Sequence, residues 1–166
     1  MKSFSGVAHV YGDNIDTDRI IPGKYTKTLD TSALASHVLE DLDPEFRHTV
    51  KPGDILVAGS NFGCGSSREQ APIAIKASGV TVVVAKSFAR IFYRNAINIG
   101  LPVVEVEKHA IQPGSQVTVD LERGEVIDHT AGRTYRATQM PDVMIDILNE
   151  GGLVNYLLKY GDYQRG

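Results

Sequence analysis

Ser66, Ser67 and Arg68 stand together at the end of a glycine-rich run, Gly59 to Gly65, and their side chains are well suited to an anionic ligand. The guanidinium of an arginine presents a planar pair of donors that matches a carboxylate or a phosphate. A hydroxyl held among glycines beside a cationic group can be activated as a base or a nucleophile, and Ser66 has that setting. The run therefore predicts an anion site with a reactive serine.

The strand before this run and the helix after it must position the run against the ligand. Ile55–Ala58 is typical of a fully buried strand, and residues 69–78 are typical of a helix rich in Ala and Ile. Ser66 to Arg68 are then expected at the helix start, where free N–H groups and the positive end of the helix dipole favour negative charge. The run lacks the patterns of a P-loop and of a dinucleotide site. Similar turns also end in a capping serine with no catalytic role.

Two other polar segments belong with this run. Asp16 and Asp18 lie in a loop after the first predicted strand, where such carboxylates usually cap turns or helices. A predicted helix over 88–97 carries Arg90 and has one apolar face with amides at its edge. We expect Arg90 and the nearby Asn98 to support the glycine-rich turn without reacting.

These three segments resemble one known family. Residues 11–22, 63–69 and 86–102 are similar, in this order, to the small subunit of 3-isopropylmalate dehydratase, which is the detached swivelling domain of the aconitase superfamily. The resemblance extends over essentially the whole chain. It implies an α/β fold with three layers, β/β/α, that forms a single swivelling domain over residues 1–166.

The resemblance also implies a chemistry. The reaction would be a dehydration and rehydration that interconverts 2-isopropylmalate and 3-isopropylmalate in leucine biosynthesis, a hydro-lyase activity on a small dicarboxylate. Ser66 would correspond to the serine that serves as an alkoxide base. Ser67 and Arg68 would hold a substrate carboxylate. Asp18 would position a basic group by a charge-assisted hydrogen bond, and Gly65 would support the turn.

Lys27 falls in a segment, 24–28, that resembles the loop contacting the variable end of the substrate in this family. Homoaconitase-type relatives place an Arg at this position, and isopropylmalate-type relatives usually place an apolar residue there, so Lys27 fits neither pattern. A lysine can present its charge to a carboxylate or lay its methylenes along an alkyl group. The sequence therefore allows homoaconitate or another substituted malate as the substrate besides isopropylmalate. It also allows Lys27 to be a solvated loop residue that does not contact the substrate.

Cys64 is the single cysteine of the chain, and we interpret it as a small turn residue. One thiolate cannot hold an iron–sulfur cluster, and no Cys or His spacing fits zinc, so no metal or cofactor is expected on this chain. The resemblance places a [4Fe–4S] cluster, whose iron would take the leaving hydroxyl, on a separate large subunit. We expect activity only with that partner, as a heterodimer or heterotetramer, and the isolated chain could self-associate.

Two functions of other kinds are compatible with the residues. A hydrolase would use Ser66 or Cys64 as its nucleophile, but the sequence around Ser66 is not a Gly-x-Ser-x-Gly elbow and no His/Asp partner stands out. A non-catalytic anion-binding module would use the same turn without chemistry. Such a module would bind a dicarboxylate tightly without any partner.

Composition bounds the class of protein. The 166 residues are 42% hydrophobic, which suits one compact domain. A formal net charge of −3 gives no electrostatic reason to expect nucleic acid or an anionic membrane as a partner. No stretch approaches the ~20 apolar residues of a membrane span, and the first residues lack the apolar core of a signal peptide. We therefore expect a cytoplasmic protein.

The remaining elements follow from hydrophobic periodicity and turn residues. Strands are predicted at 4–10, 80–85, 103–106, 116–121, 125–128 and 133–137, and helices at 31–39, 142–149 and 153–160, with a helical turn opening at 43–45. This order places parallel strands and their helices in the middle of the chain and antiparallel hairpins behind them, which favours the layered α/β fold.

Overall fold

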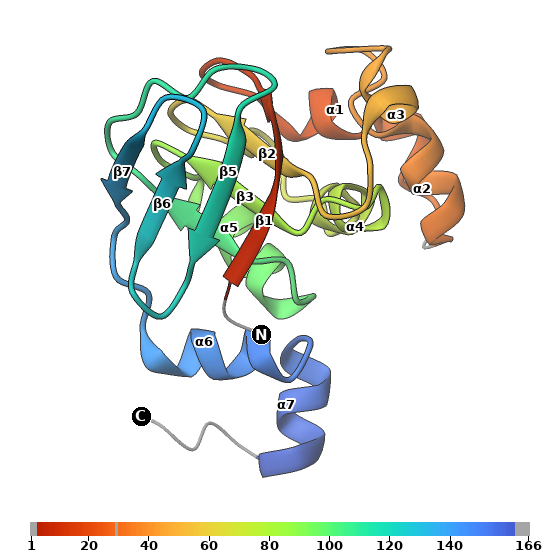
Figure 1. Ribbon diagram of the computed structural model, residues 1–166. Coiled ribbons are helices and arrows are strands. Elements are labelled where there is room, and N and C mark those ends of the chain that lie inside the picture. Colours follow the sequence, from red (N-terminus) through yellow and green to blue (C-terminus); the bar gives the residue numbers. More distant parts are fainter. Residues whose placement is uncertain (1–2, 29, 162–166) are drawn as a thin grey trace.

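The computed structural model describes residues 3–28 and 30–161 (Figure 1); residues 1–2 and 162–166 of the predicted domain, and Leu29, lie outside the described residues. Within these ranges seven strands form one mixed sheet in the order β4-β3-β2-β1-β5-β6-β7. The strands are β1 (Ser3–Val10), β2 (Ile55–Ala58), β3 (Val82–Ala85), β4 (Val103–Glu105), β5 (Gln116–Asp120), β6 (Glu125–Asp128) and β7 (Arg133–Arg136).

The sheet has a parallel half and an antiparallel half that meet at β1. Strands β1 to β4 pair in parallel, whereas β1, β5, β6 and β7 pair antiparallel. All four residues of β2 and of β3 are buried, as expected for short β-branched strands covered on both faces. The parallel half is thus the rigid interior from which the loops of the site extend.

Two separate cores lie on the two faces of this parallel half, because side chains alternate along a strand. On β2, Leu56 and Ala58 join a core under the helices, whereas Ile55 and Val57 join a second core with residues of the antiparallel half such as Val117. The sheet therefore curls so that its two halves face each other, with helices outside (Figure 1). The prediction of a layered α/β fold is confirmed.

Helices cover the outer face of the parallel half. They are α1 (Thr17–Ile20), the 3-10 turn η1 (Gly23–Tyr25), α2 (Thr31–His37), α3 (Phe46–Thr49), α4 (Gln70–Ala77), α5 (Arg90–Asn98), α6 (Asp142–Asn149) and α7 (Leu153–Tyr160). Helix α4 contacts both α2 and α5, and α6 contacts both α5 and α7. No helix in the described ranges is long and apolar enough to cross a membrane.

Some elements differ in detail from the sequence predictions. Helix α5 begins at Arg90, two residues later than predicted, because the main chain of Phe88 pairs with that of Phe62. Helix α2 ends at His37, two residues earlier than predicted, and its N-cap is Asp30, whose carboxylate accepts a hydrogen bond from Ser32 N at 3.0 Å. The loop after β1 contains the short helix α1, which forms because the side chain of Asp16 caps it.

Candidate active site

Three loops meet at one edge of the sheet, where β1, β2 and β3 end. Residues 11–22 follow β1, residues 59–69 follow β2 and residues 86–89 follow β3. Because the three strands are parallel neighbours, their carboxyl ends lie at the same edge, which is where α/β sheets usually carry their sites. The three polar segments singled out in the sequence are therefore brought together by the fold.

The first part of the glycine-rich turn is held by main-chain hydrogen bonds on both sides. Gly59 N donates to Gly12 O at 3.0 Å, and Gly59 O accepts from Lys86 N at 3.0 Å. Ser60 N donates to the carboxylate of Asp13 at 2.7 Å. The turn thus lies between the loops that follow β1 and β3, and its path is fixed before it reaches the candidate serine.

The second part of the turn is tied to α1 through a buried threonine. Thr17 N donates to Cys64 O at 2.8 Å, and Thr17 Oγ1 donates to Ser66 O, also at 2.8 Å. Thr17 is 3% exposed, so it is a fixed support. These bonds hold the main chain of Ser66 in place while Ser66 itself is exposed. Sequence reasoning missed Thr17, because nothing local separates it from an ordinary turn residue.

Two glycines of the turn are required by its geometry. Gly63 has φ of +83°, and a Cβ there would overlap the ring of Phe92 on α5. Gly65 has φ of +93°, in the left-handed region that disfavours side chains. Glycine at these positions lets the turn pass directly beside α5 and present Ser66 at its outer end.

Arg68 is held by the loop after β1. One terminal nitrogen, Nη1, donates to the carboxylate of Asp18 and to Ile21 O at 3.3 Å. The side chain of Arg68 is 21% exposed, whereas that of Asp18 is 66% exposed. The basic group that Asp18 contacts is therefore the guanidinium of Arg68. The neighbouring Asp16 has the ordinary capping role, since it accepts from Arg19 N at 2.9 Å.

A cavity of about 250 Å³ lies at the outer end of the turn. It is lined by Thr17, Gly63, Gly65, Ser66, Ser67, Arg68, Ala89, Arg90, Ile91, Phe92 and Asn95. The predicted catalytic residue, Ser66, and the predicted carboxylate ligands, Ser67 and Arg68, therefore lie at the same cavity as the first turn of α5. Sequence reasoning did not single out Ile91, whose partly exposed side chain forms an apolar wall of this cavity.

Two helices begin beside the cavity. Helix α4 begins at Gln70 with Glu69 as its N-cap, so Ser66 to Arg68 lie directly before its start, close to where the sequence places them. The first turn of α5 also lines the cavity, which the sequence did not indicate, and its N-cap residue, Ala89, has no side-chain capping bond. The free N–H groups and positive dipole end of α5 therefore favour an anion there.

Comparisons with known proteins show the family of this chain. A family model described as the aconitase C-terminal domain matches residues 5–109. The chain is 58% identical to the 3-isopropylmalate dehydratase small subunit of Caldicellulosiruptor bescii, over 93% of this chain and 94% of that protein. The chain belongs to the aconitase C-terminal domain family. Within this family it is a small subunit of the 3-isopropylmalate dehydratase family of hydro-lyases.

Two other members of the family bear on its fold and on its specificity. The crystal structure of 3-isopropylmalate dehydratase from Methanocaldococcus jannaschii matches with a TM-score of 0.92 and 49% identity, over 96% of this chain and 95% of that chain. The methanogen homoaconitase small subunit of Methanothermobacter thermautotrophicus is 56% identical, over 90% of this chain and 87% of that protein. Proteins with two different substrate names are thus similarly related to this chain.

Not every residue predicted for this family member lies at the cavity. Lys27 is exposed just beyond η1 and does not line the cavity. Asn98 is the last residue of α5, at the end away from the cavity, with its carbonyl oxygen against Gly152. The expectation that Asn98 supports the glycine-rich turn is therefore wrong, whereas Asn95 and Arg90 do line the cavity.

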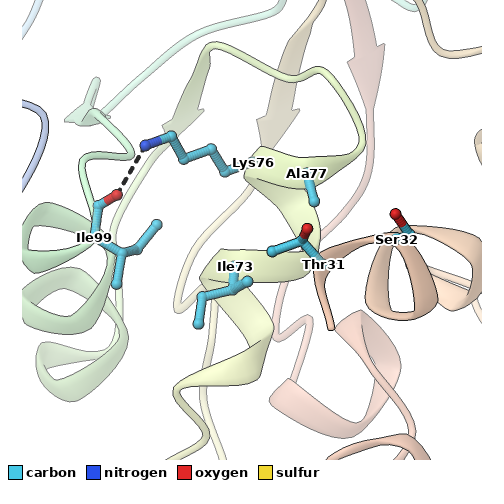
Figure 2. Close-up of a pocket in the computed structure, with 6 residues that line it drawn as sticks. All are labelled: Thr31, Ser32, Ile73, Lys76, Ala77 and Ile99. Carbon is cyan, nitrogen blue, oxygen red and sulfur yellow. Dashed lines mark hydrogen bonds between the residues drawn. The ribbon is translucent and has the colours of Figure 1, made fainter. Parts of the chain in front are cut away.

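A larger cavity, of about 530 Å³, lies on another side of this aconitase-type domain (Figure 2). Thr31 and Ser32 of α2 line it together with Ile73 and Ala77 of α4, and Lys76 Nζ donates to Ile99 O at 2.9 Å. Among the described residues that line it, the only ionisable side chain is that of Lys76, which is thus already bonded to the protein. This cavity is the larger of the two, but the smaller one is the candidate active site because Ser66, Ser67 and Arg68 line it.

The possible metal ligands of the described residues do not gather at one place. Within the described residues no group of three or more His, Cys, Asp or Glu side chains could hold a metal ion. Cys64 is a free, partly buried thiol whose main chain pairs with Asp16. A cluster that needs several thiolates does not fit the part of the chain described here.

His109 supports the carboxyl end of β2 from the inner face of the sheet. Its Nε2 lies 2.9 Å from Ala58 O and must carry the hydrogen, since a carbonyl only accepts. Its Nδ1 accepts from Ile111 N at 3.4 Å, so the neutral ring suits both neighbours. Burial lowers the pKa of His109, the hydrogen bond to Ala58 O offsets part of this, and the charge of Lys86 lowers the pKa further, so that the net shift is downward. The folded domain therefore favours neutral His109.

We expect the domain to lose stability as the pH falls below the ordinary histidine pKa of about 6.5. Because the pKa of His109 is lowered by folding, the unfolded chain binds the proton first, so stability is full above that value and declines below it. Denaturant unfolding between pH 8 and pH 5 measures this. The variant His109→Gln should flatten the profile, and His48→Gln, at an exposed histidine, should leave it unchanged.

Proposed function

We propose that the chain is the small subunit of an enzyme that interconverts 2-isopropylmalate and 3-isopropylmalate by dehydration and rehydration, a step of leucine biosynthesis. The observation that carries this proposal is the meeting of Ser66, Ser67 and Arg68 at one cavity beside the amino end of α5. The names of the relatives support the same reaction for this geometry.

Ser66 is the proposed base. The reaction removes a proton from a carbon next to a carboxylate, which requires a strong base and stabilisation of the resulting anion. Ser66 is exposed at the cavity while its carbonyl is fixed by Thr17, so the hydroxyl is accessible on a rigid main chain. An alkoxide is costly near neutral pH, and the guanidinium of Arg68 with the dipole of α5 lowers that cost by stabilising negative charge.

Arg68 and Ser67 are the proposed ligands of a substrate carboxylate. The guanidinium has five N–H donors, and the two bonds recorded here, to Asp18 and Ile21 O, both start from Nη1. The other donors are left for a planar carboxylate. Asp18 orients the guanidinium from the side of the β1 loop, and it touches Arg68 without reacting.

The chain supplies only part of the active site. Its relatives are named small subunits, which implies a large-subunit partner. We infer that the large subunit carries a [4Fe–4S] cluster, since the described residues of this chain offer no ligands for one. Such a cluster supplies a Lewis-acid iron that can accept a leaving hydroxyl. The exposed residues Asp18, Lys27 and Ser66 are proposed to face that partner.

Homoaconitate is the second candidate substrate, and two observations favour it. The homoaconitase relative is nearly as similar to this chain as the isopropylmalate relatives are, and Lys27 is a cation in the segment proposed to meet the variable end of the substrate. The ammonium could pair with an extra carboxylate, whereas the methylenes could lie along an isopropyl group. We place isopropylmalate first because most of the similar relatives carry that name.

Assembly with the large subunit of the same organism tests this function. The assembled enzyme should isomerise 2-isopropylmalate, and the small subunit alone should show no turnover because the Lewis acid lies on the partner. The values of kcat/KM for isopropylmalate and homoaconitate then rank the two substrates. Tight binding of either dicarboxylate to the isolated small subunit, with no turnover after assembly, would instead indicate a binding module.

A further inference from the structure

The segment that carries Lys27 is tied directly to the element that carries Arg68. Gln70, the first residue of α4, donates from Nε2 to Thr26 O at 2.9 Å. The guanidinium of Arg68 lies against Gly23, where an added Cβ would be 3.3 Å from both of its terminal nitrogens. Residues 23–26 therefore rest on two side chains that are only two positions apart in the sequence.

This segment is also rigid in itself. It forms the 3-10 turn η1, in which Thr26 N donates to Gly23 O at 3.2 Å and Thr26 Oγ1 donates to the same oxygen at 2.7 Å. Tyr25 N donates to Pro22 O at 3.0 Å. Lys27 is the first residue beyond these bonds. Its position is thus set by where Thr26 is held.

An aromatic and acidic cluster holds the other side of the turn. The ring of Tyr25 stacks on that of His37, with centroids 3.7 Å apart and planes 3° from parallel. Tyr25 OH donates to Glu40 at 3.1 Å, and His37 Nδ1 donates to the same carboxylate at 2.9 Å. Arg47 is 3.6 Å from Glu40. This cluster anchors Tyr25 to α2 and α3, whereas Gln70 alone links the turn to α4 by a recorded side-chain bond within the described residues.

We propose that Gln70 is a positioning residue that sets the distance between Arg68 and Lys27 and thereby the preference between substrates. This inference rests on the proposed function, in which Arg68 holds a carboxylate common to the substrates and Lys27 meets their variable end. A ligand held at both ends depends on the spacing of its two contacts. The bond from Gln70 to Thr26 fixes that spacing, because Gln70 follows Arg68 closely and Thr26 precedes Lys27 directly.

The test compares Gln70→Leu and Gln70→Glu with the wild type in the enzyme assembled with its large subunit. Leucine and glutamate keep much of the side-chain volume but cannot donate to Thr26 O. We expect each variant to raise KM and to change the ratio of kcat/KM for isopropylmalate and homoaconitate about fivefold, with kcat changed less because Ser66 is untouched. A matched control is Gln112→Leu, since Gln112 also donates its amide to a loop carbonyl, Ala110 O at 3.3 Å, but outside this site.

A double-mutant cycle asks whether Gln70 acts through Lys27. If it does, Gln70→Leu should no longer change the substrate ratio when Lys27 is already replaced by Leu, so the two effects are not additive. Lys27→Leu alone should improve the relative use of isopropylmalate. Additive effects of the two substitutions on the ratio would overturn the inference, because Gln70 would then act independently of Lys27.

Hydrogen exchange in the full-length small subunit gives a readout that does not depend on activity. The amides of residues 26–28 should exchange faster in Gln70→Leu than in the wild type or in Gln112→Leu. Unchanged exchange together with an unchanged substrate ratio would overturn the role of Gln70 while leaving the proposed function intact. If the assembled wild-type enzyme converts neither substrate, the proposed function fails, and the inference resting on it fails with it.

Discussion

Replacing Ser66 with Ala is expected to lower the kcat of the assembled enzyme by at least about three orders of magnitude, a loss of about 4 kcal/mol in transition-state stabilisation. The substitution removes the proposed base and little else. Ser66 is exposed, and its recorded bond to Thr17 uses the carbonyl oxygen, which alanine retains. Folding and assembly with the large subunit should therefore be unchanged, and steady-state kinetics with isopropylmalate measures the loss.

Ser60→Ala is the matched control for this experiment. Ser60 is an exposed serine of the same turn, and its recorded bonds to Asp13 and Asn14 use only its main chain. It does not line the cavity. The control should keep wild-type turnover. If Ser66→Ala kept turnover within about tenfold of the wild type, a loss below about 1.4 kcal/mol, Ser66 would not be the base.

Local patterns were enough to predict the layers of the fold. The runs Ile55–Ala58 and Val82–Ala85 are continuous and apolar, and runs of this kind form strands buried on both faces. Their alternate residues then supply two cores, which the curled sheet requires. The polar run after the first of these strands marks the carboxyl edge of the sheet, and the predicted candidate residues Ser66, Ser67 and Arg68 do lie at a cavity there.

The contribution of α5 to the cavity could not be predicted from sequence, because it depends on a contact between distant segments. The next helix in the chain, α4, begins just after Arg68 as predicted, but Gly63 packs directly on Phe92 and brings the start of α5 to the cavity as well. Sequence periodicity reports which face of a helix is apolar and not which turn that face contacts. The pairing of Phe62 with Phe88 is a long-range contact of the same kind.

The partner of Asp18 was also set by tertiary structure. The sequence indicates a carboxylate in a loop and an arginine fifty positions later, and no local pattern joins them. The fold joins them because β1 and β2 are parallel neighbours, so the loops that follow them lie side by side. The position of Lys27 relative to Arg68 is likewise set by Gln70 and Gly23, through contacts that no spacing in the sequence displays.

Replacing Arg68 with Lys is expected to raise KM and to lower kcat together, with kcat/KM reduced about 100-fold or more, about 2.7 kcal/mol. The charge is retained but the planar fork is lost. In the native protein Nη1 bonds Asp18 and Ile21 O, while other donors of the same group remain for a carboxylate. A lysine ammonium that pairs with Asp18 has no second arm to hold the substrate, and it stabilises an alkoxide at Ser66 from a different position.

The control for this substitution is Arg94→Lys, at an exposed arginine of α5 that does not line the cavity. Kinetics of both variants in the assembled enzyme, with thermal unfolding of each small subunit, separate catalysis from stability. Loss of activity with an unchanged melting temperature supports a substrate contact. Wild-type kinetics with a lowered melting temperature would instead make Arg68 a structural partner of Asp18, since an ion pair that is partly exposed contributes only about 0–1 kcal/mol to folding and nothing to turnover.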